Sequence, residues 1–596
     1  MDRNSAIGLT LIAVLLLVYF NFFSPAPQPE ESPATTTLPQ QTHPSTPVDT
    51  VTLAVDSAKL IQYGALATLL QGEEKSIQVE NADLRMAFST KGGIVKELEL
   101  KKFKTYYQQP LYLVQPGTNT FSLITQYEGK DIDLYAFYYE ASTREVQDST
   151  QLIFTARMGD GAYIRQTYTV PPSGYQIGYR IETKGVNNLS SDYFILNWRD
   201  QIPAVEKDIN DTRNKTTITY YSAAGEYDEL SEASQDTETE VFANPMKWVT
   251  IKQKFFLSGI IAKSSFQGGE VRTSVNPSDT TTIKDASVRL IIPKAEVAST
   301  GAQFTYFFGP NKYSITSKID HEFNSNLYLG WPPVKWVNKF LILPIFKFLE
   351  RFIGSYGVII MILVLIIKII LLPLSYKSYM GMAKMKLLKP ELDVIKEKYG
   401  DNMTQIQQEQ LKLYQQAGVS PFSGCIPLLL QMPILFAMFY FFPVSIELRQ
   451  ASFLWAEDLS TYDSILNLPF TIPFYGSHVS LFVLLMTAST MIYTWQNNQI
   501  SSVQGPMKTM SLIMPVIFMF VLNSFAAALS FYYFVSNLVT FAQQAIIKRF
   551  VDEDKIKKIM DEHKKKIASG GGKQSKFMAK LQEAMKASEE AKRKGK

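Results

Sequence analysis

The chain has 596 residues, of which 46% are hydrophobic and 19% charged, and its formal net charge is +4. A mean hydropathy of −0.03 at this length indicates that long apolar segments and a large polar portion average out. Cys425 is the only cysteine, which excludes an intrachain disulfide and a cysteine-based metal site. The four histidines are widely separated in sequence, so neither a metal site nor a cofactor is predicted.

An apolar run opens the chain, from Ala6 to Phe23. At about 18 residues it is long enough to cross a bilayer. The proline that follows Ser24 disfavours signal cleavage there. We therefore predict a retained transmembrane anchor over residues 1–23, with a cleaved signal peptide as the alternative. Residues 24–75 are rich in Pro, Thr, Ser and Gln, which predicts a flexible tether.

Residues 76–325 have the composition of β-strands. Segments 163–170 and 175–183 are rich in β-branched and aromatic residues, and Gly-Gly and Pro-Pro pairs mark turns. This pattern predicts one large all-β sandwich domain. Because no catalytic cluster is recognisable in it, a scaffold or docking role is favoured. Sugar or peptide binding is the alternative.

Five closely spaced apolar segments follow, at residues 358–376, 422–443, 477–495, 508–523 and 526–547. With the anchor they make six predicted spans. None contains Asp or Glu. Lys368 is the cation inside a segment, whereas Lys508 and His478 lie at segment edges. A lone ammonium at membrane depth costs at least about 2.5–3.5 kcal/mol. Lys368 therefore either snorkels to the interface or lies in a water-filled groove. On a straight helix ending near Tyr376 it would lie roughly 12 Å from the membrane edge, which favours the groove.

Charge predicts the orientation of these spans. Residues 24–330 carry 28 Lys/Arg and 36 Asp/Glu, a net −8, whereas residues 548–596 carry 16 and 8, a net +8. Positive flanks stay in the cytoplasm. We therefore expect both termini in the cytoplasm and the β domain on the opposite side of the membrane.

The predicted core covers residues 355–547. One amphipathic region precedes this core, and a second lies within it, after the first of the five apolar segments. Lysines and aromatic residues interleave over residues 333–352, as in a helix lying along the membrane surface, with a partly buried connector as the alternative. Residues 377–420 predict a cytoplasmic helical hairpin. Its Met380, Met382 and Met385 either pack between the two arms or offer an adaptable surface to apolar guests.

The predicted spans also contain polar side chains, including Gln431 and several Ser, Thr, Asn and Gln residues of segment 526–547. A single residue of this kind usually forms a hydrogen bond between two membrane helices. Several of them together with an unpaired lysine favour a water-filled cavity in the membrane-spanning region. A secondary transporter of a small solute is the alternative function. It usually requires an intramembrane acid and repeated halves, and the sequence has neither. An intramembrane protease is disfavoured because no histidine is expected near Ser423.

Five motifs in this region carry a family resemblance: residues 376–388 (YKSYMGMAKMKLL), 423–433 (SGCIPLLLQMP), 446–450 (IELRQ), 514–518 (MPVIF) and 532–540 (YYFVSNLVT). In sequence and order they resemble the bacterial members of the YidC/Oxa/Alb family of membrane protein insertases. The anchor, tether and β domain resemble the long Gram-negative form, which implies that the tether and the β domain are periplasmic. Two departures stand out. Lys368 occupies the position of the family's usual groove arginine, and Asn523-Ser524-Phe525-Ala526 occupies that of its Pro-Ser-Gly element.

The resemblance implies an insertase and chaperone of the inner membrane that is not an enzyme. Its substrates would be nascent membrane proteins, taken into a positively charged groove open to cytoplasm and lipid. Lys368 would supply the charge, Gln431 would lie beside it, and Tyr532 and Tyr533 would form an apolar slide. An ammonium keeps the attraction for acidic residues but lacks the planar fork of arginine.

The basic tail, residues 548–596, has three interpretations. Its lysine clusters can attract ribosomal RNA, or they can attract anionic lipids. In the third interpretation they stay in solvent and only fix the orientation of the protein in the membrane. We expect the ribosome to bind the tail and hairpin, and we name a Sec translocon as a further candidate partner. No DNA partner is predicted.

Overall fold

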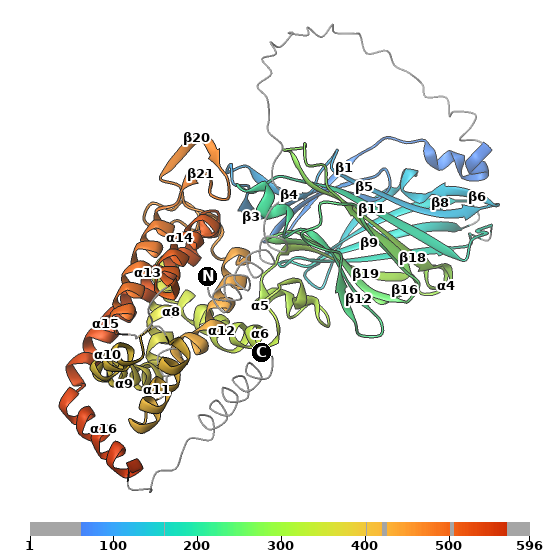
Figure 1. Ribbon diagram of the computed structural model, residues 1–596. Helices are drawn as coiled ribbons and strands as arrows, with labels where there is room; N and C mark the ends of the chain where they lie inside the picture. The colour runs from blue at the N-terminus through green and yellow to red at the C-terminus, as the bar shows by residue number, and fades with distance from the viewer. Residues whose placement is uncertain are drawn as a thin grey trace. The chain divides into compact units, whose positions relative to one another are not determined.

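The computed structural model describes residues 61–159, 161–186, 188–400, 402–419, 426–500 and 506–568 (Figure 1). The predicted anchor, most of the tether and the end of the basic tail lie outside these residues. The chain divides into two compact units, Met1–Leu327 and Tyr328–Lys596. The first unit is built from β-sheets and the second from helices.

Three antiparallel sheets form the first unit. The largest runs in the order β13 (Tyr227–Glu229), β12 (Thr217–Ser222), β15 (Met246–Lys252), β16 (Phe256–Phe266), β19 (Ala302–Pro310), β10 (Gln176–Lys184), β9 (Ala162–Val170), β8 (Ser149–Met158) and β7 (Glu140–Val146). The second runs in the order β14 (Glu238–Phe242), β17 (Gly269–Ser274), β18 (Thr282–Pro293), β11 (Tyr193–Pro203), β5 (Asn119–Tyr127) and β6 (Lys130–Asp133). The third consists of β1 (Ser76–Glu80), β2 (Leu84–Ser89), β3 (Ile94–Lys104) and β4 (Pro110–Val114).

The sheets pack face to face, which confirms the predicted β-sandwich. Alternate residues of β9 are buried, as expected for a strand with one face on the core. Trp198 of β11 lies 6.0 Å from Phe308 of β19 between ring centroids, joining the six-stranded and nine-stranded sheets. Phe88 of β2 lies 4.8 Å from Tyr168 of β9, joining the third sheet to the largest. Aromatic contacts therefore hold all three sheets around one interior.

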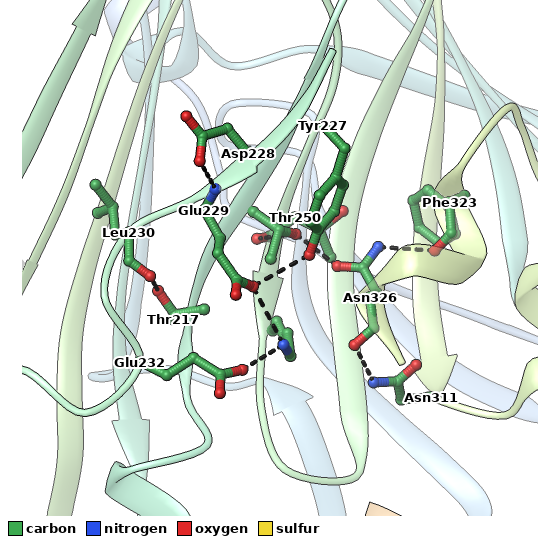
Figure 2. A network of polar contacts seen from close by, with 12 residues as sticks. Thr217, Tyr227, Asp228, Glu229, Leu230, Glu232, Thr250, Asn311, Phe323 and Asn326 are labelled. Atoms are coloured by element: carbon green, nitrogen blue, oxygen red, sulfur yellow. Dashed lines mark hydrogen bonds and ion pairs between the residues drawn. The ribbon is translucent and has the colours of Figure 1, made fainter. Parts of the chain in front are cut away.

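A polar network fixes the end of the β unit (Figure 2). Asn326 belongs to the 3₁₀ turn η3 (Phe323–Asn326) and accepts a hydrogen bond of 2.5 Å from Thr219 of β12. Its carbonyl accepts from Asn311 at 2.9 Å, and its amide donates to the Phe323 carbonyl at 2.9 Å. Buried hydrogen bonds of this kind favour one arrangement of the groups that form them. The chain therefore leaves the β unit from a fixed point on its largest sheet.

A second part of the same network lies beside it. Lys252 of β15 bridges Glu229, at 3.3 Å, and Glu232, and Tyr227 donates to Glu229 at 3.1 Å. Lys252 is buried, and a buried ammonium requires such partners. These contacts attach the edge strand β13 and the segment after it to the interior of the sheet.

Asp200 gives the β unit a predicted pH dependence. Its side chain on β11 is buried, and burial, reinforced by the nearby Asp285, raises the pKa of Asp200 to about 8. An unfolded aspartate has a pKa of about 3.9, so the folded state holds the proton more tightly. The contribution of protonated Asp200 to the free energy of unfolding is therefore fully present below about pH 4 and is lost as the pH rises toward 8.

Replacing Asp200 with asparagine is therefore expected to raise stability at pH 8 by at least about 2 kcal/mol, because the neutral amide needs no proton. Thermal unfolding of the full chain between pH 4 and 8 would measure this. The exposed Asp236→Asn is the control, with no change expected. An unfolding midpoint that falls equally with pH in the wild type and in Asp200→Asn would contradict the assignment.

The second unit is helical. Its elements are α6 (Pro332–Val337), the π-helical turn η4 (Asn338–Ile342), α7 (Leu343–Glu350), α8 (Tyr356–Ile370), α9 (Leu372–Leu387), α10 (Lys389–Tyr399), α11 (Met403–Gln416), α12 (Ile426–Phe441), α13 (Leu481–Ile500), α14 (Pro506–Leu522), α15 (Ala527–Phe550) and α16 (Glu553–Ala568). A two-stranded hairpin, β20 (Leu466–Ile472) and β21 (Gly476–Val479), lies at one end of this unit and α16 at the other (Figure 1).

Within the described part of the chain, no single helix has both the length and the hydropathy required to cross a bilayer. Helices α8 and α9 meet the requirement only as a pair, and they are bent by 63° relative to each other. Pro373 lies in the first turn of α9, where proline is tolerated but cannot continue the hydrogen-bond ladder of a preceding helix.

Two predicted boundaries were wrong. The apolar segment 477–495 does not begin as a helix, because β21 occupies Gly476–Val479 and places His478 on a strand. Ser480 then starts α13 by accepting a hydrogen bond from the backbone N–H of Val483 at 3.1 Å. The first arm of the hairpin, predicted as one helix over about residues 376–398, is also divided: α9 ends at Leu387 and α10 begins at Lys389, with Pro390 in its first turn.

The segment from α6 to α7 has two distinct faces. Val334, Ile342 and Phe346 are buried, and the side-chain amide of Asn338 donates to the Ala437 carbonyl of α12 at 3.0 Å. On the other side, large aromatic side chains are exposed: Trp336, Phe340, Phe348 and Phe352. The segment is therefore anchored to α12 by one face and presents an aromatic surface on the other.

Candidate functional site

Lys368 lies in the last turn of α8, two residues before that helix ends. The 63° bend follows at once, so the straight helix assumed for the sequence-based distance to the membrane edge was wrong. The residue is only 6% exposed. The lysine is therefore an interior residue placed at a bend, and its distance from either membrane surface cannot be obtained by counting residues to Tyr376.

Two helices, α12 and α15, supply the polar contacts of Lys368. Its Nζ donates to Oγ1 of Thr540 on α15 at 2.9 Å and to Oε1 of Gln431 on α12 at 3.3 Å. Gln543, one turn beyond Thr540, donates its side-chain amide to the Lys368 carbonyl at 3.0 Å. Among the described residues, no carboxylate forms an ion pair with this ammonium. Neutral oxygens thus hold the charge in place without cancelling it.

A belt of polar side chains continues from Thr540 between α13 and α15. The Thr540 hydroxyl also donates to the Ser536 carbonyl at 2.7 Å. Asn537 donates to both Ser489 and Thr490 of α13, each at 2.9 Å. Three further hydroxyls in this bundle are buried without a hydrogen-bond partner among the described residues: Thr487, Ser530 and Ser536. We refer to all of these residues, with Lys368, Gln431 and Gln543, as the polar belt.

The two predicted slide residues lie on α15, away from the lysine. Tyr532 is buried, and its ring lies 6.1 Å from Phe442 and 5.9 Å from Tyr533. Tyr532, Ser536 and Thr540 are spaced four residues apart and share one face of the helix. Eight residues separate Tyr532 from Thr540, about 12 Å along the axis. The aromatic pair therefore adjoins the polar belt in the direction of the β20–β21 hairpin and does not touch Lys368.

A buried asparagine ties the hairpin end of the bundle together. Asn523, between α14 and α15, donates its side-chain amide to the carbonyls of Tyr475 and His478, both at 2.8 Å. Its side-chain oxygen accepts from the Ser480 N–H at 3.1 Å, and its carbonyl lies 2.9 Å from Nε2 of His478. The sequence analysis noted Asn523 only as part of a departure from the family pattern, because all of these partners are distant in sequence.

Asp463 caps α13 at the same end. One carboxylate oxygen accepts from the backbone N–H of Leu481 at 2.9 Å and of Phe482 at 3.1 Å, and from the Trp455 indole at 2.8 Å. The other accepts from the hydroxyl of Ser480. An acidic cap satisfies otherwise unpaired N–H groups and favours the positive end of the helix dipole. Sequence reasoning missed it, although Asp463 precedes an apolar run.

The three predicted methionines lie on α9 at the opposite end. Met380 and Met385 are partly buried against a cluster formed by α10, α11 and α16: Leu388, Leu392, Leu413, Tyr414, Ala417, Val419, Ile556 and Met560. Met382 is also half-buried. Two ion pairs attach α16, between Lys386 and Glu553 at 3.0 Å and between Lys564 and Glu391 at 2.6 Å. We call α9, α10, α11 and α16 together the hairpin body.

Comparison with known families defines the class of this protein. Residues 348–555 match the family model described as 60Kd inner membrane protein, and residues 76–346 match the YidC periplasmic domain. The chain is thus a membrane protein with a large periplasmic β-sandwich domain and a C-terminal helical region.

Individual relatives cover nearly the whole chain. The membrane protein insertase YidC of Amoebophilus asiaticus is 46% identical over 601 residues and covers 99% of each chain. That of Cytophaga hutchinsonii is 45% identical over 622 residues, 99% of this chain and 98% of the relative. A crystal structure of an active YidC insertase with its first transmembrane domain resolved covers 82% of this chain and 97% of its own, at 20% identity and a TM-score of 0.33.

The chain belongs to the YidC family of membrane protein insertases. Its function is the insertion of membrane proteins, and its substrates are nascent membrane proteins. This confirms the family and the function predicted from the sequence motifs. The alternative of a secondary transporter is not favoured.

Proposed function

We propose that Lys368 is the positive centre of a hydrated groove through which the polar tails of client proteins cross part of the membrane. The observation that carries this proposal is its set of partners. The ammonium donates to Thr540 and Gln431, both neutral, while its own chain provides no described carboxylate to neutralise it. An uncancelled interior charge retains its attraction for an acidic residue of a passing client.

The polar belt supports hydration of this groove. Buried hydroxyls normally have a hydrogen-bond partner, and water is the usual partner where the protein supplies none. Thr487, Ser530 and Ser536 are buried hydroxyls of this kind, on α13 and α15. Water along the belt would shorten the hydrocarbon distance that a polar tail must cross. The groove would then lower the barrier to insertion without covalent chemistry.

The apolar part of the client would leave along the aromatic pair. Tyr532 and Tyr533 continue the belt face of α15 with large, mostly apolar rings. A client helix that passes from this surface into lipid gains roughly 25 cal/mol for each Å² of apolar surface removed from water. The client helix would thus move from the hydrated polar belt, past Tyr532 and Tyr533, into the bilayer.

We further propose six membrane spans with both termini in the cytoplasm. Helix α8 and the start of α9, to about Tyr376, would provide one span, and α12, α13, α14 and α15 four more, with the N-terminal anchor as the sixth. Helices α13 and α15, with 20 and 24 residues, are long enough. Their mean hydropathy is lowered by the same polar residues that the groove requires. The β-sandwich would then lie in the periplasm, consistent with its negative net charge.

The hairpin body and the basic tail would face the cytoplasm and the ribosome. Lysines of α16 and of the residues beyond it provide sequence-independent attraction to ribosomal RNA or to anionic lipid headgroups. Met380, Met382 and Met385 lie on α9, the helix of this body that directly follows the helix of Lys368. A Sec translocon remains a further proposed partner of the helical unit.

A cysteine-labelling experiment tests the hydrated groove. In a Cys425→Ser background, single cysteines are placed at positions 368 and 540, and at Leu363, a buried apolar position of α8. A membrane-impermeant maleimide added from the cytoplasmic side is expected to label positions 368 and 540 at least about ten-fold faster than position 363, since thiolate formation requires water. Labelling of all three positions at the same slow rate would contradict a hydrated groove.

A further inference from the structure

The outward face of the nine-stranded sheet is hollowed into an open trough of about 830 Å³. On β9, Arg165, Thr167 and Thr169 line the trough, while the alternate residues Gln166 and Tyr168 are buried in the core. Similar positions on the neighbouring strands extend it from β7 to β15. The trough is therefore a continuous surface made by the solvent side of seven adjacent strands.

The charge of this trough is opposite to that of the rest of the domain. Its lining contains six cations and two acids: Arg144, Arg157, Arg165, Arg180, Lys247, Lys263, Glu182 and Asp320. That is a net +4. All other residues in the range 76–327 carry 20 Lys/Arg and 28 Asp/Glu, a net −8. A positive surface concentrated on one face of an acidic domain attracts anions selectively to that face.

Half of these cations have no carboxylate partner among the described residues. Glu182 is shared by Arg165, at 3.2 Å, and Arg180, at 2.7 Å. Arg157 pairs at the edge with Glu140 at 3.1 Å.

The other three cations donate to neutral oxygens: Arg144 to Gln151 at 3.0 Å, Lys263 to Gln303 at 3.2 Å and Lys247 to the Lys263 carbonyl at 2.7 Å. These three charges lie on β7, β16 and β15, at the two sides of the trough, and are available to an acidic ligand.

We propose that the trough binds an extended acidic polypeptide segment. Seven strands at about 4.8 Å spacing give a width of about 29 Å, which accommodates about nine residues of an extended chain at 3.3 Å each. Threonine and glutamine side chains between the cations offer hydrogen bonds to a peptide backbone.

Other anionic ligands fit the surface less well. Phe304 and Tyr179 are the aromatic residues of the lining and both are buried, so no exposed ring is present to stack on a sugar. A concave surface also cannot lie flat against the headgroups of a bilayer.

The inference deepens the proposed function and rests on it for the source of the peptide. Translocated tails of clients carry their acidic residues to the periplasmic side, where this domain is proposed to lie.

The test uses the full-length protein in detergent and a fluorescent peptide of about nine residues in which Glu and Ser alternate. Anisotropy is expected to detect binding that weakens with salt and is absent for the same peptide with Gln in place of Glu. Lys247→Glu combined with Lys263→Glu is expected to weaken binding at least about ten-fold, since two attractions become repulsions. Arg272→Glu with Arg289→Glu, exposed on the six-stranded sheet, is the charge-matched control and should leave the affinity unchanged.

Two results would overturn the assignment. One is equal peptide affinity for the wild type and both double variants. The other is a lysine-dependent interaction with vesicles containing phosphatidylglycerol in the absence of any interaction with the peptide, which would make the trough a lipid-binding surface. Lys368→Ala separates this inference from the groove: it should leave peptide binding intact, because the groove residue belongs to the other unit of the chain.

Discussion

Replacing Lys368 with alanine is expected to reduce insertion of clients with a short acidic translocated tail by at least about ten-fold. A charged residue at the bilayer centre costs about 2.5–3.5 kcal/mol, and about 1.4 kcal/mol of lost compensation corresponds to a factor of ten in rate. The alanine variant loses the ammonium that contacts Thr540 and Gln431 and retains the rest of the polar belt. Protease protection of a radiolabelled client in proteoliposomes would measure the effect.

Two comparisons make this prediction specific to charge. Lys368→Arg should retain insertion, because it keeps the positive charge although its planar fork differs from the compact ammonium. A client with Asn and Gln in place of the tail acids should insert equally well into proteoliposomes of the wild type and of the alanine variant. If the alanine variant were equally impaired with the neutral client, Lys368 would have a structural role and no role in charge capture.

The second large effect is expected at Asn523. Asn523→Ala removes two hydrogen bonds donated to the carbonyls of Tyr475 and His478 and one accepted from Ser480. Each buried polar group left without a partner costs about 1–3 kcal/mol. We expect the thermal unfolding midpoint of the detergent-solubilised protein to fall by at least about 5 °C. Ser524→Ala, at the neighbouring exposed position, is the control and should not change it.

A functional measurement sharpens the Asn523 prediction. The asparagine ties the connection between α14 and α15 to the start of α13 and to β21. If its role is to hold this end of the bundle closed, proteoliposomes containing Asn523→Ala should lose insertion activity at a lower temperature than the wild type. An unchanged midpoint together with unchanged activity would mean that this connection is held by other contacts.

Strand alternation was readable from the sequence, whereas contacts between distant segments were not. The alternating pattern of 163–170 corresponds to β9, and the predicted sandwich followed from such segments. The apolar run around His478 could not be divided into a strand and a helix by composition, because short apolar runs suit both. The bend after Lys368 was also missed, although Pro373 was a local signal for it.

The candidate site shows the same limit. Lys368 could be singled out because an isolated cation in an apolar segment is costly. Its contact with Thr540 joins residues 172 positions apart, which no local pattern encodes. Asn523 was visible only as a departure from a family motif, because its partners lie more than forty positions away. The docking of α16 likewise depends on ion pairs with α9 and α10 that are distant in sequence.

The attachment of α16 has a mechanical consequence. Val551, Ile556 and Met560 share one apolar cluster with the hairpin arms, and the His563 ring fills the space beside Gly418 so closely that an added methyl group would lie 2.9 Å from it. A pull on the chain beyond α16 would therefore act on α9 through these contacts. The 63° bend at the other end of α9 lies next to Lys368, so a shift of the hairpin body would displace the chain close to the ammonium.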